Sequence, residues 1–274
     1  MRAAEVVAHR GASDDVAEHT LAAYLRAVED GADALECDVR LTADGHLVCV
    51  HDRRVDRTSD GRGPVSTLEL ADLDALDFGS WHPGSVDAPD LVVGPDGGRS
   101  ADPSRTRVLT LEALLGFVAD CGRPVPLAIE TKHPTRYAGL VERRLVELLA
   151  RHGLTGRPAD DEYPPVRVMS FSVLSLRRMR QLAPDVSTVL LLDRVPLRFR
   201  DGSLPYYVHA AGPSLEVVKA HPRYVERAHA HGNPVHVWTV DDPADVEFCL
   251  DLGVEAIVTN RPRQVLTQLG RPVQ

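Results

Sequence analysis

Short apolar runs alternate with segments of helical periodicity along most of the chain. Residues 5–9 (EVVAH) are apolar and rich in β-branched side chains, and the apolar positions of residues 18–30 recur every three or four residues before Gly31. The same alternation continues and predicts strands at residues 5–9, 34–39, 125–131, 166–171, 187–192, 206–210, 234–240 and 255–259. It predicts helices at residues 18–30, 110–120, 136–152, 172–182, 214–231, 243–252 and 261–269.

This alternation of strands and helices predicts an α/β fold. The eight strands and the helices between them make about eight strand–helix units, and eight is the number that closes a parallel barrel. The chain is therefore expected to form a single (β/α)8 TIM barrel over residues 1–274.

The apolar run at residues 46–51 does not fit the parallel scheme. When the preceding strand is continued to residue 41, only Thr42-Ala43-Asp44-Gly45 separate the two runs, whereas a parallel crossover needs a dozen or more residues. The intervening Asp44-Gly45 pair is a hairpin signal. Residues 46–51 are therefore expected to add an antiparallel hairpin strand to the barrel.

A loop-rich insertion is expected at residues 52–109, after the second strand. Within it, residues 79–107 are rich in Pro, Gly and Asp and follow the carboxyl end of a strand, which places them on the catalytic face of a barrel. Residues 154–165 have a similar composition but follow a helix, so they belong to the opposite face. Only the first segment is a candidate lid or substrate cap.

Composition and charge narrow the class of partner. The 274 residues are 43% hydrophobic and carry a net charge of −9, with no stripe of Lys and Arg, so we expect a soluble globular protein without a nucleic-acid partner. No signal peptide and no apolar span of 18 residues is present, which predicts a cytoplasmic location and no stable membrane insertion. The pattern does not specify the oligomeric state.

The cysteines are expected to be buried free thiols. They form no CxxC pair and lie in mostly apolar contexts, which disfavours a disulfide framework or a zinc site. The four positions are Cys37, Cys49, Cys121 and Cys249.

Carboxylates gather where strands of the predicted barrel end. Glu36 and Asp38 are two residues apart in a strand, so their side chains point to the same face. Glu130 on a later strand adds a third carboxylate, and such an oxygen-rich set favours a hard cation, Mg²⁺ or Ca²⁺, over Zn²⁺. The alternative is a pair of solvated or ion-paired acids at a strand end.

Histidines and cations are expected at the same rim. His9 and His51 are candidate proton-transfer groups because imidazole titrates near neutral pH, and Asp52 either orients His51 or caps the next turn. Arg10 and Lys132 suit an anionic substrate such as a phosphate; the alternative is that both are simply ion-pair partners of the acids.

Two aromatic residues complete the candidate site. Phe171 follows a strand, and Trp238 alternates with apolar residues in a late strand. Trp238 is either a core residue or a wall of the pocket that packs against an aliphatic part of the substrate.

Taken in order, these segments resemble the glycerophosphodiester phosphodiesterase family. The resemblance runs from about residue 5 to residue 265, and the order of its segments makes it far more specific than HRG alone. The matching segments are His9-Arg10-Gly11, Glu36-Cys37-Asp38-Val39, Thr42-Ala43-Asp44-Gly45, His51-Asp52, Glu130-Thr131-Lys132, Ser170-Phe171, Trp238-Thr239-Val240 and Thr259-Asn260-Arg261-Pro262.

The resemblance implies a (β/α)8 barrel that hydrolyses glycerophosphodiesters to sn-glycerol 3-phosphate and an alcohol with one divalent cation, Mg²⁺ or Ca²⁺. It implies three metal ligands (Glu36, Asp38 and Glu130), two acid-base histidines (His9 and His51) and two phosphate-facing cations (Arg10 and Lys132). Which histidine is the acid, which cation is bound and which alcohol is released stay open.

The chain departs from the family pattern at two places. Glu18-His19-Thr20 stands where the family usually has Glu-Asn-Thr, so an imidazole replaces an amide beside the rim. Glu18 either pairs with Arg10 or suits the helix dipole that follows it. The second departure is Gly253-Val254-Glu255-Ala256 in place of Gly-Val-Asp-Gly. Neither change removes an implied metal ligand.

Two rival functions are compatible with these residues. A lysophospholipase D-type enzyme would expose an apolar groove, for which Trp81 and Leu91-Val92-Val93 give weak support. A non-catalytic barrel that binds phosphorylated ligands or a partner protein is expected to have lost a histidine or an acid, whereas every such position is filled here.

Overall fold

The barrel predicted from the pattern is present in the computed structural model, which describes residues 3–83, 91–93, 99–101, 106–135, 139–156 and 164–271. Eight parallel strands follow the order β10-β11-β1-β2-β6-β7-β8-β9. Parallel bridges join Ala211 to Val235 and Ser214 to Trp238, so the two end strands meet and the barrel nearly closes. The strands are β1 (Glu5–Ala8), β2 (Ala34–Leu41), β6 (Leu127–Thr131), β7 (Val166–Ser170), β8 (Ser187–Leu192), β9 (Ala210–Pro213), β10 (His236–Val237) and β11 (Ala256–Thr259).

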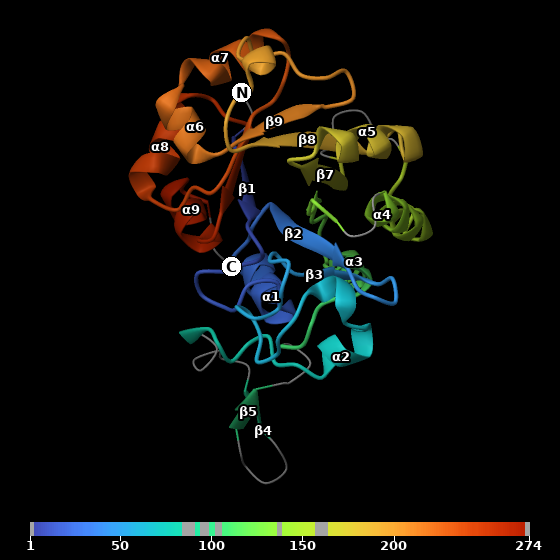
Figure 1. Ribbon diagram of the computed structural model, residues 1–274. Coiled ribbons are helices and arrows are strands. Elements are labelled where there is room, and N and C mark those ends of the chain that lie inside the picture. Colours follow the sequence, from blue (N-terminus) through green and yellow to red (C-terminus); the bar gives the residue numbers. More distant parts are fainter. Residues whose placement is uncertain are drawn as a thin grey trace.

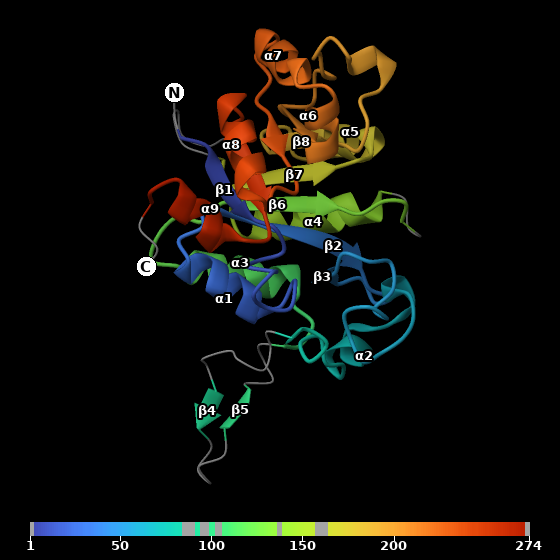
Figure 2. The same ribbon diagram turned by 90° about the vertical axis from the view of Figure 1, so that its left-hand side faces the viewer.

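Helices cover the outside of the barrel (Figures 1 and 2). They are α1 (Leu21–Glu29), α3 (Leu111–Asp120), α4 (Leu140–Arg151), α5 (Val173–Leu182), α6 (Leu215–Ala220), α7 (Arg223–Ala230), α8 (Pro243–Asp251) and α9 (Pro262–Gln268), with a 3₁₀ turn η4 (Leu197–Phe199). Several begin at a side chain that accepts a backbone N–H bond, as Thr20 does from Ala23, which satisfies a donor left free in the first turn. None of the helices in the described ranges is long and apolar enough to cross a bilayer.

Three predicted elements differ from the structure, of which one is the expected strand at 234–240, reduced to the two residues of β10. The expected helix at 214–231 is two helices, α6 and α7, because Pro222 lacks an N–H and restricts His221 before it. The expected strand at 206–210 begins only at Ala210, where β9 pairs with β8. Pairing with the neighbouring strand, rather than the apolar Tyr206-Tyr207-Val208 run, sets this register.

The extra hairpin strand is confirmed. β3 (Leu47–Cys49) runs antiparallel to β2, with Val39 opposite Cys49. The thiols are free, as expected; Cys37, Cys49 and Cys249 are buried, whereas Cys121 is only half-buried.

The insertion has more regular structure than the loop-rich expectation allowed. It contains a 3₁₀ turn η1 (Val65–Thr67), the helix α2 (Leu70–Asp74) and an antiparallel pair, β4 (Leu91–Val93) and β5 (Arg99–Ala101). It packs against the hairpin strand in a separate buried cluster, which consists of Val48, Val50, Val55, Val65, Leu73, Phe78 and Val108. Most of the candidate lid at 79–107 and residues 157–163 of the second predicted loop lie outside the described residues.

Side chains alternate between the barrel interior and the helix layer. Val7, Ala34, Ala128, Met169 and Val258 form part of an interior cluster. The residues between them in sequence pack toward the helices in two larger clusters, as the period of two along a strand requires. β3 and α2 lie on the side to which the strand arrows point (Figure 2). The candidate site is formed by the interior-facing residues of the strands that lie nearest to that side.

Gly11 makes the turn that carries the chain away from β1. Its φ is +85°, and a Cβ there would lie 2.6 Å from the backbone carbon of Ala23. We expect Gly11→Ala to lower the free energy of unfolding by roughly 2–4 kcal/mol, because strain and overlap add. Gly253→Ala is the control: its φ is +74° with nothing within 4 Å of the added carbon, so only about 1–2 kcal/mol is expected. Urea denaturation measures both, and equal losses would contradict the overlap argument.

Candidate active site

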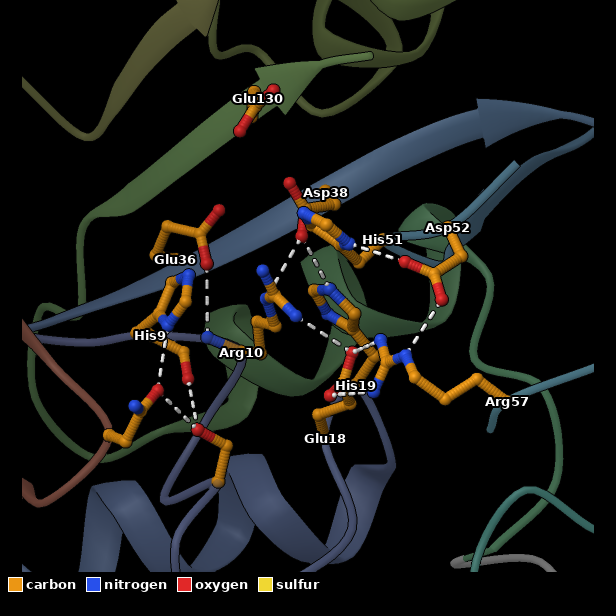
Figure 3. Close-up of polar contacts among 12 residues, drawn as sticks. His9, Arg10, Glu18, His19, Glu36, Asp38, His51, Asp52, Arg57 and Glu130 are labelled. Carbon is orange, nitrogen blue, oxygen red and sulfur yellow. Dashed lines mark hydrogen bonds and ion pairs between the residues drawn. The ribbon is translucent and has the colours of Figure 1, made fainter. Parts of the chain in front are cut away.

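Three buried carboxylates meet at the carboxyl ends of β2 and β6. Glu36, Asp38 and Glu130 each bring an oxygen within 4.8 Å of the others. Parallel pairing sets Asp38 beside Glu130, and the two-residue spacing turns Glu36 to the same side (Figure 3). Buried like charges at this spacing repel unless a cation or protons offset them.

Asp38 is the carboxylate of the cluster with the most nitrogen partners. Lys132 Nζ lies 3.2 Å from Oδ1, and Arg10 Nε and His19 Nε2 lie 3.2 and 2.9 Å from Oδ2. Burial alone would raise the pKa of Asp38, but the His19 hydrogen bond and the charges of Lys132 and Arg10 hold it well below its usual value. Asp38 is therefore ionised at neutral pH.

The pKa values of the other two carboxyl groups, Glu36 and Glu130, are shifted in the opposite direction. Burial and the Asp38 charge raise the pKa of Glu36 well above its usual value, and they raise that of Glu130 to about 8. Lys132 opposes this shift at Glu130, whose Oε1 lies 2.9 Å from its ammonium. An all-oxygen set of three buried carboxylates has the donor chemistry of a Mg²⁺ or Ca²⁺ site, and these residues fit such an ion.

His9 is fixed as one tautomer by the segment after β11. Its Nδ1 donates to Asn260 Oδ1 at 2.7 Å, and the Asn260 amide is held in turn by Asp241 Oδ2 at 2.7 Å. Loss of solvent, with a further effect of Arg10, lowers the pKa of His9 to about 3. The neutral ring therefore presents Nε2 as a proton acceptor.

His51 is fixed by a chain of charged groups from the insertion. Its Nδ1 donates to Asp52 Oδ1 at 2.7 Å, and Arg57 Nε binds Asp52 Oδ2 at 2.7 Å. Arg57 also makes two 2.8 Å bonds to Glu18, which pairs with Arg10 at 2.9 Å (Figure 3). One guanidinium thus links the orientation of His51 to that of Arg10.

Arg10 adopts a strained backbone conformation. Its φ is 59°, in the left-handed region that non-glycine residues rarely occupy. Its N–H donates to Glu36 Oε2 at 3.0 Å, so this turn attaches the backbone directly to the carboxylate cluster. Strain held by such contacts is common at functional sites.

The predicted residues line one cavity of about 100 Å³. On its apolar side Phe171 meets Trp238 edge to face, with ring centroids 5.4 Å apart. Trp238 also donates from Nε1 to the Gly212 carbonyl at 2.6 Å, so it is both a packed residue and a cavity wall. The predicted residues at this cavity are His9, Arg10, Glu36, His51, Glu130, Lys132, Phe171 and Trp238. Asp38 lies behind them and contacts Arg10 and Lys132.

Residues 9–264 match the profile of the Glycerophosphoryl diester phosphodiesterase family. The chain belongs to this family. The resemblance inferred from the sequence motifs is thereby confirmed.

Members and structural neighbours of the family match almost the whole chain. The probable glycerophosphodiester phosphodiesterase 1 of Mycobacterium tuberculosis (strain ATCC 25618 / H37Rv) is 47% identical over 257 residues, 94% of this chain and 89% of the relative. The glycerophosphodiester phosphodiesterase of Bacillus subtilis (strain 168) is 36% identical over 262 residues, 93% of this chain and 83% of the relative. A phosphodiesterase structure from Oleispira antarctica, in complex with the product sn-glycerol-3-phosphate, superposes with a TM-score of 0.77 at 22% identity, covering 97% of this chain and 96% of that chain. This last likeness shows the fold.

His19, where the chain departs from the family pattern, lies beneath the cluster rather than at the cavity. It is buried, with φ 60°, and joins Asp38 to the Tyr24 hydroxyl, 2.8 Å from its Nδ1. Tyr24 in turn bonds the Glu36 carbonyl at 3.1 Å. His19 therefore supports the β2 carboxylates from behind.

Three residues of the site were not predicted from the sequence: Arg57 and Asn260, which hold Asp52 and His9, and His236, which lines the cavity. Asn260 directly follows a strand, and His236 is two residues before Trp238, so the strand-end and strand-face rules point to both. Arg57 had no comparable signal, because several arginines of the insertion share its local context. Only the folded insertion distinguishes it.

Proposed function

We propose that this protein hydrolyses glycerophosphodiesters to sn-glycerol 3-phosphate and an alcohol with the help of one divalent cation, Mg²⁺ or Ca²⁺. The observation that supports this most strongly is the buried cluster of Glu36, Asp38 and Glu130 in a cavity that His9 and His51 also line. The related phosphodiesterase that holds sn-glycerol-3-phosphate has the same fold. A histidine or an acid is present at every proposed catalytic and metal-binding position, which favours catalysis over binding alone.

In this proposal, different side chains hold the cation, bind the phosphate and contact the aliphatic part of the substrate. Glu36, Asp38 and Glu130 would hold the cation, which when bound stabilises negative charge on the phosphoryl oxygens. Arg10 and Lys132 now pair with acids of the cluster, and they add positive charge beside the phosphate. Phe171 and Trp238 pack against the aliphatic part of the substrate.

The two histidines move the protons. One takes a proton from the attacking hydroxyl, which is water or the glycerol 2-hydroxyl, as its oxygen bonds to phosphorus. The other donates a proton to the alcohol oxygen as its bond to phosphorus breaks. Both rings donate from Nδ1 to an oxygen acceptor, so Nε2 is the nitrogen that faces the reaction: it accepts the proton in the neutral ring that acts as base, and it carries the proton to be donated in the imidazolium ring that acts as acid. When the glycerol hydroxyl attacks, water opens the cyclic product in a second step.

A substrate panel tests the proposed reaction. The wild-type protein with Mg²⁺ or Ca²⁺ is expected to release glycerol 3-phosphate from glycerophosphocholine and to turn over lysophosphatidylcholine poorly. Turnover of the lipid alone would favour the lysophospholipase D-type function, for which Trp81 is an exposed aromatic residue. Binding of phosphate ligands with no turnover of any diester would favour the non-catalytic barrel.

Arg57 is expected to act as a positioning residue in this reaction. Arg57→Gln removes the bonds to Asp52 and Glu18, so we expect kcat/KM to fall by roughly 10–100-fold, the usual cost of losing an outer partner. The pH-rate profile should also change, since Asp52 would no longer be held against His51. Arg54→Gln is the matched control, because Arg54 is exposed and pairs with Asp56. Equal kinetics in the two variants would contradict the positioning role.

A further inference from the structure

A second cavity lies beside the candidate active site. Its volume is about 300 Å³, and it lies between the insertion and the segment that follows β6. Its polar lining comes from Arg40, Arg53, Ser66, Lys132 and Thr135, and the rest of the lining is apolar. We call it the cationic cavity. Lys132 also lines the candidate active site, so the two cavities share a wall.

Two of the three cations that line this cavity, Arg40 and Arg53, have no carboxylate bonded to them in the described residues. No Asp or Glu is among its described lining residues. Lys132 is paired with Asp38 and Glu130, whereas the exposed Arg53 has no carboxylate partner in the part of the chain that the structure describes. Arg40 bonds a neutral group, the His51 carbonyl, at 2.6 and 3.0 Å. The guanidinium groups of Arg40 and Arg53 therefore line the cavity, and neither is bonded to a carboxylate.

Further features indicate that an anion would be stabilised there. The Thr135 Oγ1 atom is buried without a hydrogen-bond partner in the described structure, and such an atom needs an acceptor or donor to offset its desolvation. Arg40 and Arg53 line the same cavity, so their like charges are neighbours. An anion between the two guanidinium groups would relieve their repulsion.

We propose that the cationic cavity binds an anionic group on the alcohol portion of the substrate. The inference rests on the proposed function, which places the reacting phosphate at Lys132. Glycerol carries no charge, so an anion in the neighbouring cavity must belong to the other alcohol. The volume equals that of about ten water molecules in the liquid, enough for a phosphorylated headgroup. The preferred diesters are those whose alcohol bears a second phosphate.

Kinetics on a matched pair of substrates test this specificity. We expect the wild-type protein to have a higher kcat/KM for glycerophosphoinositol 4-phosphate than for glycerophosphoinositol. Arg53→Gln should lower that ratio by roughly tenfold, the value of one hydrogen bond to a charged group. Arg54→Gln removes an adjacent arginine that does not line the cavity, and the ratio should stay at its wild-type value. A ratio that Arg53→Gln leaves unchanged would overturn the proposal.

A binding measurement separates this proposal from the proposed function. Titration calorimetry of the full chain with inositol 1,4-bisphosphate needs no turnover, and Arg53→Gln should weaken the Kd by roughly tenfold relative to Arg54→Gln. If the protein hydrolyses glycerophosphoinositol but Arg53→Gln binds inositol 1,4-bisphosphate as tightly as Arg54→Gln does, the subsite is refuted and the proposed reaction is not. Arg53-dependent binding with no glycerol 3-phosphate released from any diester would support the subsite and refute the proposed reaction.

Discussion

His51→Ala is expected to lower kcat for glycerophosphocholine by roughly 10²–10⁴-fold, the contribution of one positioned acid-base group. KM and the affinity for the divalent cation should change little, because His51 contacts none of the three clustered carboxylates through a hydrogen bond or ion pair within the described residues. The reason for the large kcat effect is the fixed ring: Asp52 holds Nδ1, and Nε2 is the nitrogen left to exchange a proton. Steady-state kinetics at saturating cation measure both constants.

A histidine on the adjacent hairpin provides the control for this variant. His46 is exposed in the turn between β2 and β3 and pairs with Asp44, so His46→Ala should leave kcat near the wild-type value. A kcat for His51→Ala that matches that of His46→Ala would remove His51 from the mechanism. Unchanged thermal unfolding in both variants would show that folding does not explain the difference.

Glu36→Gln is expected to abolish most divalent-cation binding. The substitution keeps the shape of the side chain and removes one of three carboxylates within 4.8 Å of one another. We expect the cation affinity to fall by more than about 100-fold, since loss of an outer partner alone typically costs 10–100-fold. Activity at a fixed, low cation concentration should fall in proportion. Calorimetric titration with Mg²⁺ and with Ca²⁺ measures the affinity directly.

An acid on the outer surface provides the comparison for Glu36. Glu29 lies exposed near the end of α1, so Glu29→Gln also removes one negative charge without touching the cluster. Equal cation affinity in the two variants would mean that net charge, rather than the cluster, sets binding. Retention of wild-type affinity in Glu36→Gln would show that Glu36 is not a ligand.

Most of the barrel was predictable because its strands carry local signals. The β-branched runs of β1, β7 and β8 are short, apolar and bounded by turns, and Asp44-Gly45 marks the hairpin to β3. β9 was misplaced because Ala210–Pro213 has no β-branched residue and its position depends on pairing with β8. The break at Pro222 had a clear signal, but the apolar periodicity continues across it because both halves pack on the barrel.

The candidate site was predictable where it follows from strand geometry. Residue parity alone places Glu36 and Asp38 on one face, and the carboxyl-end rule brings Glu130 to them. The Arg57 contacts could not be predicted in this way, because Glu18 and Arg57 are 39 positions apart and meet only through the fold of the insertion. Local patterns carry no information on such a contact.

The most direct test of the account is the release of glycerol 3-phosphate from glycerophosphocholine by the wild-type protein beside His9→Ala. Each protein is assayed after chelation of divalent cations and again after Mg²⁺ or Ca²⁺ is restored. We expect no release after chelation, recovery in the wild type with one of the two cations, and a rate roughly 10²–10⁴-fold lower in His9→Ala. Release that persists in the chelator, or that His9→Ala leaves unchanged, would contradict the account.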